Sequence, residues 1–190
     1  MRTALIVIDV QNEYFDGRLP IGYPDRDASL SDIELAMDAA SSNGIPVIVV
    51  RHTGEPGEGS FEEGSNGWEL RAEIADRPRD VLIDKHMPGS FTGTPLGAWL
   101  DERSIDHVTI CGYMTNVCCD TTARQALHRG MQATILHDAM GVPPMRGVDD
   151  ELIDAESLHR AALAPLRLIG VEMMTSADWI DRVRDQPPSP

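Results

Sequence analysis

The sequence of 190 residues has few basic residues, few cysteines and no long apolar run. Its 16 Lys and Arg face 31 Asp and Glu, which gives a formal net charge of −15. Such a charge repels phosphate backbones and anionic membrane surfaces, and no basic stripe offsets it. The apolar runs at 4–8 and 45–50 are far shorter than the roughly 20 residues that span a bilayer. We therefore expect neither nucleic acid nor a membrane as a partner.

The cysteines are too few and too close together for a disulfide framework. Cys111, Cys118 and Cys119 leave at least one thiol unpaired. Met1 and Arg2 lead directly into a strand-like run, without the pattern of a signal peptide. These features predict a cytoplasmic protein, in which each cysteine must be a core residue, a ligand or a nucleophile.

Apolar runs and helix-like stretches alternate along the chain. The runs that predict strands are 4–8, 45–50, 81–83, 107–111, 133–136 and 171–174. The stretches that predict helices are 30–42, 96–103, 117–129 and 149–166. Pro165 could interrupt the last of these helices. This alternation requires crossover connections and favours a mostly parallel sheet. The length fits one domain, which we place at 1–184, followed by a Pro-rich tail at 185–190 that we expect to be disordered.

Polar residues follow several of the predicted strands. Asp9, His52, Lys85 and the turn 112–118 all come at or just after a strand end. Ligands of parallel sheets bind beyond the carboxyl ends of the strands, so these positions are candidates for function. Residues 53–66, rich in Gly and Glu, predict a long loop over the same end, which is a candidate lid.

Cys118 is the first candidate for chemistry. The turn before it enters a helix, and unpaired N–H groups and the dipole at a helix start favour a thiolate and could also form an oxyanion hole. Lowering an ordinary thiol pKa of about 8.5 by about two units needs a nearby cation or base as well. The alternative is that Cys118 and Cys119 are small core residues. Adjacent positions on a helix point in different directions, so Cys119 could be core while Cys118 faces the site.

Asp9 and Lys85 are the other two candidates. A carboxylate directly after a buried strand loses solvation, which raises its pKa and suits it to act as a general base. A buried ammonium at Lys85 would compensate Asp9 and favour a thiolate at Cys118. The alternatives are an ordinary strand-end aspartate that caps a turn and an ordinary surface lysine.

Together these residues lie in motifs that resemble the isochorismatase-like cysteine hydrolase superfamily. The motifs are IDVQN at 8–12, KHMPGSFTGT at 85–94 and GYMTNVCCDTTA at 112–123, and the resemblance runs from Thr3 to about Ser176. The superfamily includes nicotinamidases, carbamoylsarcosine and biuret amidohydrolases and streptothricin hydrolases. The resemblance implies a three-layer α-β-α fold with a six-stranded, mostly parallel, doubly wound sheet.

The resemblance also implies a mechanism. The catalytic triad would be Asp9, Lys85 and Cys118, with Asp9 taking the thiol proton and Cys118 attacking a carbonyl carbon to form a thioester. A cis peptide bond between Tyr113 and Met114 would aim the N–H groups of Met114 and Cys118 at the oxyanion. Such a site would cleave an amide, urea-like or lactam C–N bond of a small molecule.

The sequence departs from the nicotinamidases of that superfamily. They carry an Asp-x-His metal motif after the second strand, where this chain has Arg51-His52-Thr53. A lone His52 does not make a metal site, because stable sites need three or four converging ligands. We therefore expect no metal and no other cofactor, and we interpret His52 as a pocket residue or a structural one.

Several side chains could line the pocket at this end of the sheet. The candidates for substrate binding are Phe15, His52, Trp68, Phe91, Tyr113 and Asn116. Core or lid packing is the alternative for Trp68 and Phe91, and a helix cap is the alternative for Asn116. The resemblance further implies a homodimer or homotetramer.

Two other functions stay open. A protein of the same fold could bind a small molecule or a partner without turnover, with the triad present but unused. An isochorismatase-type enzyme would hydrolyse a vinyl ether by protonation and would need no nucleophile, so Cys118 argues against that reaction.

Overall fold

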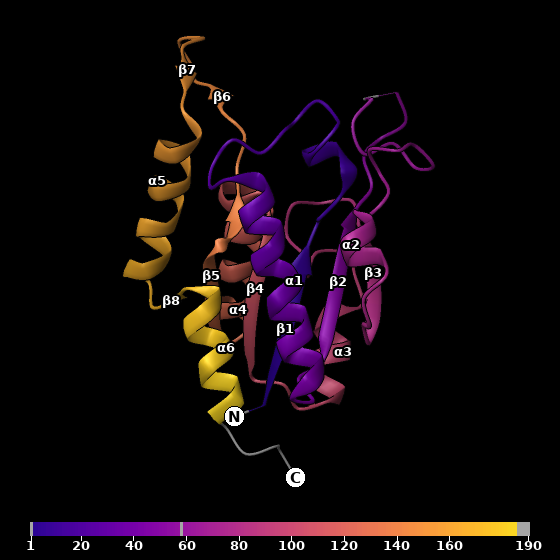
Figure 1. Ribbon diagram of the computed structural model, residues 1–190, viewed down its shortest axis with the longest axis vertical. Coiled ribbons are helices and arrows are strands. Elements are labelled where there is room, and N and C mark those ends of the chain that lie inside the picture. Colours follow the sequence, from indigo (N-terminus) through magenta and orange to yellow (C-terminus); the bar gives the residue numbers. More distant parts are fainter. Residues whose placement is uncertain (1, 58, 186–190) are drawn as a thin grey trace.

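Within residues 2–57 and 59–185, which the computed structural model describes, six parallel strands form the central sheet (Figure 1). Their order is β3-β2-β1-β4-β5-β8. The strands are β1 (Thr3–Ile8), β2 (Val47–His52), β3 (Val81–Lys85), β4 (His107–Tyr113), β5 (Gln132–Gly141) and β8 (Glu172–Met174). All six predicted strands are present, and the predicted parallel α/β fold is confirmed.

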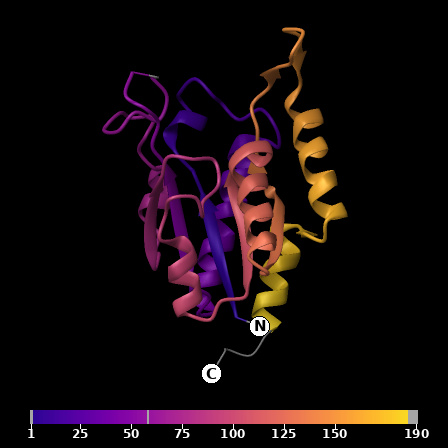
Figure 2. The ribbon, with the colours of Figure 1, turned by 180° about the vertical axis from the view of Figure 1, so that it is seen from behind.

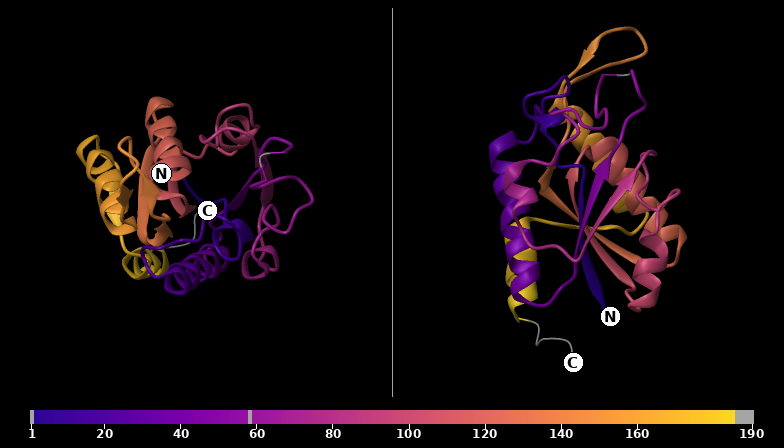
Figure 3. Two further views of the ribbon diagram at one scale, coloured as in Figure 1. Left: turned by 90° about the horizontal axis from the view of Figure 1, so that it is seen from above. Right: turned by 90° about the vertical axis from the view of Figure 1, so that its right-hand side faces the viewer.

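Helices cover both faces of this sheet. They are α1 (Arg26–Ser42), α2 (Ala72–Ala75), α3 (Leu96–Glu102), α4 (Asp120–His128), α5 (Ala155–Leu168) and α6 (Ser176–Asp185), with a short 3₁₀ turn, η1 (Asn12–Tyr14), and a π turn, η2 (Thr115–Cys119). Views from above and from the side show α1 and α6 on one face and α3 and α4 on the other, which makes three layers (Figure 3). Seen from behind, α5 flanks α4 at the edge of the second helical layer (Figure 2).

The alternation of side chains along β1 explains why its sequence is apolar throughout. Leu5 and Val7 pack in the core under α1 and α6, whereas Ile6 and Ile8 pack in the core under α3 and α4. A strand buried on both faces has no polar side, so it reads as a continuous apolar run. Asp9 follows the five apolar residues directly. Its carboxylate therefore lies at the upper edge of the sheet, at the end of the inner strand β1.

The segment 149–154 differs from the prediction. We expected one helix over 149–166, but α5 begins at Ala155, because the Asp154 carboxylate caps it by accepting hydrogen bonds from Ser157 N at 2.9 Å and Ser157 Oγ at 2.7 Å. The residues before it form an antiparallel hairpin of β6 (Met145–Arg146) and β7 (Leu152–Ile153), which rises above the sheet (Figure 1). Pro165 lies inside α5 without ending it.

The other helix limits also differ in detail. α1 begins at Arg26, ahead of the predicted residue 30, because the Asp25 side chain accepts a hydrogen bond from Ala28 N. α6 was not predicted, and it includes Asp185, the first residue of the predicted tail; residues 186–190 lie outside the described residues. None of the described helices is long and apolar enough to cross a bilayer.

Candidate active site

Asp9, His52 and Lys85 meet because they end three neighbouring strands. β1, β2 and β3 are adjacent and parallel, and His52 and Lys85 are paired in register as the last residues of β2 and β3. Asp9 follows β1 directly, and its N–H donates to Val50 O at 2.9 Å. The upper edge of the sheet therefore gathers an acid, an imidazole and the only lysine of the chain.

Lys85 is the centre of the site. Its Nζ lies 2.7 Å from Asp9 Oδ2, 3.3 Å from Cys118 Sγ and 3.5 Å from His52 Nδ1. An ammonium has three N–H donors and no acceptor, so these three contacts use all of its donors. The structure thus brings the three residues of the expected triad together and adds His52 as a fourth member.

The Asp9–Lys85 ion pair is fully buried. The two residues are 0% and 1% exposed. Burial raises the pKa of Asp9 above its ordinary value, although the Lys85 charge opposes this. Burial works to lower the pKa of Lys85, but its interactions with the Asp9 carboxylate, and with the Cys118 sulfur where that ionises, outweigh burial and raise that pKa. The pair is therefore an ammonium beside a carboxylate that is more basic than usual.

Asp9 is also strained and incompletely bonded. Its φ of 52° lies in the left-handed region, which a residue other than glycine adopts at a cost of about 1–2 kcal/mol. Oδ2 forms an ion pair with the Lys85 ammonium, and Oδ1 is buried with no N–H or O–H donor among the described residues, so the neighbouring Cys118 thiol is the further group that interacts with the carboxylate. A buried carboxylate oxygen with a free lone pair can accept a proton from a neighbouring group.

Cys118 lies in the π turn η2, directly after β4 and before α4. The peptide bond between Tyr113 and Met114, which opens this turn, is cis, as the family resemblance implies. The thiol is 6% exposed, and its pKa differs from the expected low value: burial, and then the charge of Asp9, raises it to about 12 despite Lys85. At neutral pH the resting sulfur is therefore a thiol, which must lose its proton during the reaction.

The other two cysteines are core residues. Cys111 and Cys119 are fully buried, and burial raises the pKa of both thiols. Cys119 packs with Ala123 and Ala126 under α4, and Cys111 packs in the opposite core with the thiol directed at Ile6 O. Adjacent cysteines thus have different surroundings, and only Cys118 contacts Lys85 among the described cysteines.

Two of the expected pocket residues form part of the core. Tyr113 is fully buried, and its hydroxyl shares a 2.8 Å hydrogen bond with Ser29 Oγ of α1. Phe15 packs edge-on against the Tyr113 ring and lies between the guanidinium groups of Arg26 and Arg71. Their side chains stabilise the wall behind the site and do not line an open pocket.

Three other expected pocket residues are partly buried and held by protein contacts. The Trp68 indole N–H donates to Thr53 Oγ1 at 2.8 Å, and Phe91 lies under the Arg129 guanidinium. Asn116 Nδ2 lies 3.3 Å from Met145 Sδ, and its Oδ1 is buried without a hydrogen-bond partner in the described part of the chain. Of the six expected pocket residues, His52 is the one in hydrogen-bond contact with the triad.

Sequence reasoning missed two residues of the site, Gln11 and Phe61. Gln11 is fully buried, accepts from His52 N and donates to the carbonyl oxygens of His52 and Trp68, which holds the loop against β2. The ring of Phe61 packs edge-on against His52 and also contacts Tyr14. Phe61 could have been found as the single aromatic residue in a Gly- and Glu-rich loop. Gln11 could have been found as the polar residue two positions after Asp9.

The donor set does not favour a metal. Within residues 2–57 and 59–185, no group of three or more His, Cys, Asp or Glu side chains could hold a metal ion. His52 faces the Lys85 ammonium, which repels a cation.

This geometry agrees with a family match over almost the whole chain. A family profile described as Isochorismatase domain matches residues 3–178. The chain belongs to the isochorismatase family. A solved structure from Burkholderia xenovorans LB400 superposes with a TM-score of 0.94 at 42% identity, over 99% of this chain and 90% of that one. The fold of isochorismatase-like hydrolases is therefore the fold of this protein.

Curated relatives of the chain include a named hydrolase and a named amidohydrolase. The chain is 30% identical to YddQ of Bacillus subtilis (strain 168), an uncharacterised isochorismatase family protein, over 95% of this chain and 99% of YddQ. It is 31% identical to a streptothricin hydrolase of Streptomyces noursei, over 85% and 64% of the two chains. It is also 31% identical to the ureidoacrylate amidohydrolase RutB of Methylobacterium radiotolerans, over 85% and 72%. The isochorismatase family is thus a hydrolase family with amidohydrolase members.

Proposed function

We propose that this protein is a cysteine-dependent amidohydrolase that cleaves a C–N bond of a small amide, urea-like or lactam substrate through a thioester. The contact that carries the proposal is the buried Lys85 ammonium, 2.7 Å from Asp9 and 3.3 Å from the Cys118 sulfur. The amidohydrolases among its relatives support the same class of reaction.

The first step transfers the thiol proton of Cys118 to Asp9 while sulfur attacks the carbonyl carbon. Because the thiol is neutral at rest, proton transfer and attack occur together. Oδ1 of Asp9 has no N–H or O–H donor among the described residues, so it is free to receive the proton. Lys85 stabilises the sulfur as it gains negative charge. A C–S bond forms, and the carbonyl π electrons move to oxygen to give a tetrahedral oxyanion.

The oxyanion requires donors at the turn between β4 and α4. We assign this role to the backbone N–H groups of Met114 and Cys118. Met114 directly precedes η2, and Cys118 is the fourth residue of η2. Such donors are preorganised and supply electrostatic stabilisation without an ion.

The remaining steps restore the enzyme. The oxyanion collapses, the C–N bond breaks, and protonated Asp9 gives its proton to the leaving nitrogen. Water then adds to the thioester with Asp9 again acting as the base. The C–S bond breaks, the acid product leaves, and Cys118 recovers its proton.

A panel of primary amides, ureas, ureido acids and lactams, assayed for ammonia or amine release, tests the proposal. We expect turnover by the wild type and by Cys119→Ala, and none by Cys118→Ala. Mass spectrometry of the quenched reaction should find the acyl group on Cys118. Turnover that is unaffected by Cys118→Ala contradicts the mechanism, and ligand binding without turnover across the panel favours the binding-protein alternative. Turnover of a vinyl ether alone would favour the isochorismatase-type reaction.

The expected homodimer or homotetramer stays a prediction. Large apolar side chains are exposed on the β6–β7 hairpin and at the end of α5, namely Val148, Leu152, Ile153, Leu168 and Ile169. The hairpin residues lie at one end of α5, and Leu168 and Ile169 lie at the other end. Exposed apolar patches are typical of association surfaces. Size-exclusion chromatography with light scattering measures the assembly.

A further inference from the structure

His52 is the polar side chain of the site that the proposed steps leave unused. It is partly buried at the end of β2, beside the fully buried Lys85 and Asp9. The Gln11 side chain forms two hydrogen bonds of 2.9 Å with the His52 backbone. The Phe61 ring packs edge-on against the imidazole, with 5.3 Å between the ring centroids. The ring is therefore held in a defined place next to the nucleophile.

The contact with Lys85 determines which ring nitrogen of His52 carries the proton. An ammonium can only donate, so Nδ1, 3.5 Å from Lys85 Nζ, must be the acceptor. A neutral imidazole with an unprotonated Nδ1 carries its proton on Nε2. Burial, and then the charges of Lys85 and His86, lowers the pKa of His52 to about 4, which agrees with a neutral ring at pH 7.

The Nε2–H group has no assigned acceptor. Lys85 is the hydrogen-bond partner found for the imidazole among residues 2–57 and 59–185, and Nε2 is not one of the buried unpartnered atoms. Nε2 lies across the ring from the nitrogen that contacts Lys85, and its N–H is therefore available to a ligand. Since Cys118 Sγ and His52 Nδ1 both contact the same Lys85 nitrogen, a ligand attacked by the sulfur passes close to this donor.

We propose that Nε2–H of His52 donates a hydrogen bond to a second acceptor oxygen of the substrate. The substrate class is then an amide or urea with another carbonyl or carboxylate beside the scissile group, such as an acylurea or a malonamate-like acid. This inference rests on the proposed function and narrows its substrate.

Matched substrate pairs test the second acceptor. N-acetylurea is compared with N-ethylurea, and malonamate with 3-methylbutanamide, by kcat/KM for ammonia release. We expect the wild type to prefer the acceptor-bearing member of at least one pair by about 10- to 100-fold, because a site built to hydrogen-bond a group rejects the analogue that lacks it.

Two variants of His52 separate recognition from support of Lys85. In His52→Asn the side-chain oxygen can still accept from Lys85, but no donor reaches the position of Nε2. In His52→Gln the amide N–H reaches that position. The preference should fall to about one in His52→Asn and persist in part in His52→Gln, while the exposed His128→Gln serves as a control with wild-type preference.

Some outcomes would overturn this inference alone. A wild-type ratio near one in both pairs, or an unchanged ratio in His52→Asn, would do so while Cys118-dependent hydrolysis upheld the proposed function. An equal loss for both members of a pair in His52→Asn would assign His52 to the support of Lys85.

Two readouts do not need turnover. Nitrogen-15 NMR of histidine-labelled protein should show His52 protonated on Nε2 at pH 7, and a proton on Nδ1 would refute the inference. Calorimetry on Cys118→Ala should detect tighter binding of the acceptor-bearing member. Equal binding, or no binding of either member, refutes the inference. Tighter binding without turnover in the wild type would refute the proposed function instead.

Discussion

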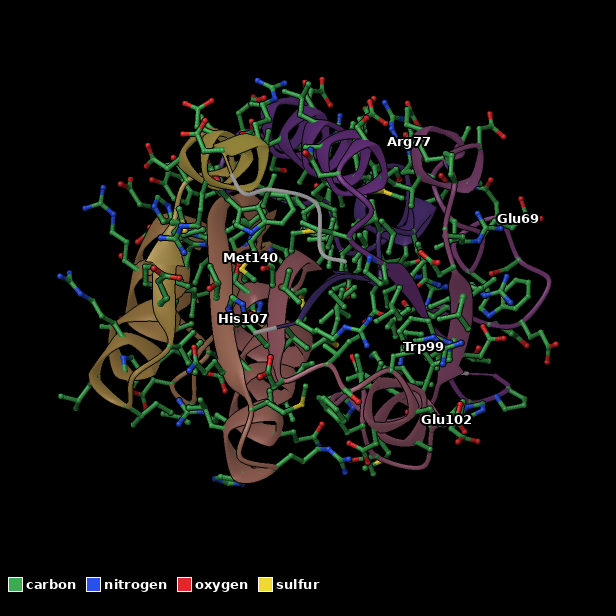
Figure 4. The ribbon with its side chains drawn as sticks, turned by 90° about the horizontal axis from the view of Figure 1, so that it is seen from below. Glu69, Arg77, Trp99, Glu102, His107 and Met140 are labelled. Carbon is green, nitrogen blue, oxygen red and sulfur yellow. The ribbon has the colours of Figure 1, made fainter. Side chains whose placement is uncertain are left out.

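A polar network that contains a histidine lies at each of the two ends of the sheet, and only the upper network has a fully buried ion pair. The upper network consists of Asp9, Lys85, Cys118 and His52, as described above. The lower one begins at His107, the first residue of β4, which Figure 4 shows from below. Both networks combine a histidine with an ion pair, but they differ in how far their polar groups are hydrogen-bonded.

The lower network is a continuous chain of hydrogen bonds. The Thr134 hydroxyl donates to Glu172 Oε2 at 2.8 Å, so it must accept the 2.8 Å hydrogen bond from His107 Nε2. Arg182 then closes the chain with two hydrogen bonds of 2.7 Å to the Glu172 carboxylate at the surface. The charged pair is partly solvated, and the chain of hydrogen bonds joins β4, β5, β8 and α6.

The upper network is strained and open. Asp9 has a left-handed backbone and an oxygen without an N–H or O–H donor among the described residues, and its ion pair with Lys85 has no solvent to relax into. Groups in such states cost stability and persist where the surrounding fold holds them. The proposed site of chemistry is thus the network whose ion pair is both buried and incompletely hydrogen-bonded, whereas the network with the partly exposed ion pair is structural.

The largest expected effect is on turnover at the upper network. Cys118→Ala should lower kcat by about 10⁴-fold or more, because it removes the nucleophile. Cys119→Ala, the adjacent control, should keep turnover and cost about 1 kcal/mol or more of unfolding free energy as a core truncation. Ammonia release and urea unfolding measure the two. An inactive Cys119 variant beside an active Cys118 variant would reverse our register.

Asp9→Asn should lower kcat by about 10²- to 10⁴-fold with little change in substrate affinity. The amide keeps the shape of the carboxylate but can neither take the thiol proton nor return it. Steady-state kinetics and binding to the inactive variant separate the two effects. A variant with wild-type kcat would remove Asp9 from the mechanism.

Lys85→Met compares the stability roles of the two networks. It leaves the buried Asp9 carboxylate unpaired and should cost about 3–5 kcal/mol of unfolding free energy at pH 7. Arg182→Met removes the cation of the lower network, where the pair is partly exposed, and should cost about 1 kcal/mol or less. Urea unfolding measures both losses of unfolding free energy. Equal losses would show that the two ion pairs contribute equally to stability.

Acid stability should depend on His159, which joins α5 to the nucleophile turn by a 2.9 Å hydrogen bond between Nδ1 and Thr115 Oγ1. Burial, and then the charge of His137, lowers the pKa of His159 to about 4. The unfolded chain therefore binds more protons than the folded one between pH 6.5 and 4. Stability from the neutral ring is complete above pH 6.5 and is lost as the pH falls toward 4, by up to about 3 kcal/mol.

His159→Gln should reduce the slope of unfolding free energy against pH in this window, as measured by urea unfolding at a series of pH values. Some slope should remain, because the pKa values of His52 and His107 are lowered in the same direction. An unchanged slope in the variant would show that His159 is already protonated in the folded protein.

The smallest expected effect is that of chelation. Hydrolysis should survive exhaustive treatment with a chelator, because carbonyl polarisation is assigned to backbone N–H groups and the Arg51-His52-Thr53 segment lacks a carboxylate and imidazole set. Activity assays before and after chelation, with metal analysis of the protein, measure this. A loss of activity that zinc, iron or manganese restores would indicate that His52 is a metal ligand. The proton that we place on Nε2 would then be wrong.

The central strands could be predicted from sequence because they are buried on both faces. A run such as Ala4–Ile8 has no polar side to confuse its periodicity, and the polar residue that ends it marks the functional edge of a parallel sheet. The β6–β7 hairpin could not be predicted in this way, because two-residue strands are too short for a pattern. Helix α6 was missed because its start depends on a contact of Ser176 with Asp138, which is 38 residues away.

The candidate triad residues, the six central strands and the absence of disulfides follow from the sequence alone, the triad through motifs that resemble a known family and the other two through residue type and local pattern. The protonation states of the site do not. The Cys118 thiol is neutral because the elements around it exclude water, and the His52 proton lies on Nε2 because a lysine from the neighbouring strand occupies the other nitrogen. Solvation and hydrogen bonding are sums over residues distant in sequence, so only the folded structure decides them.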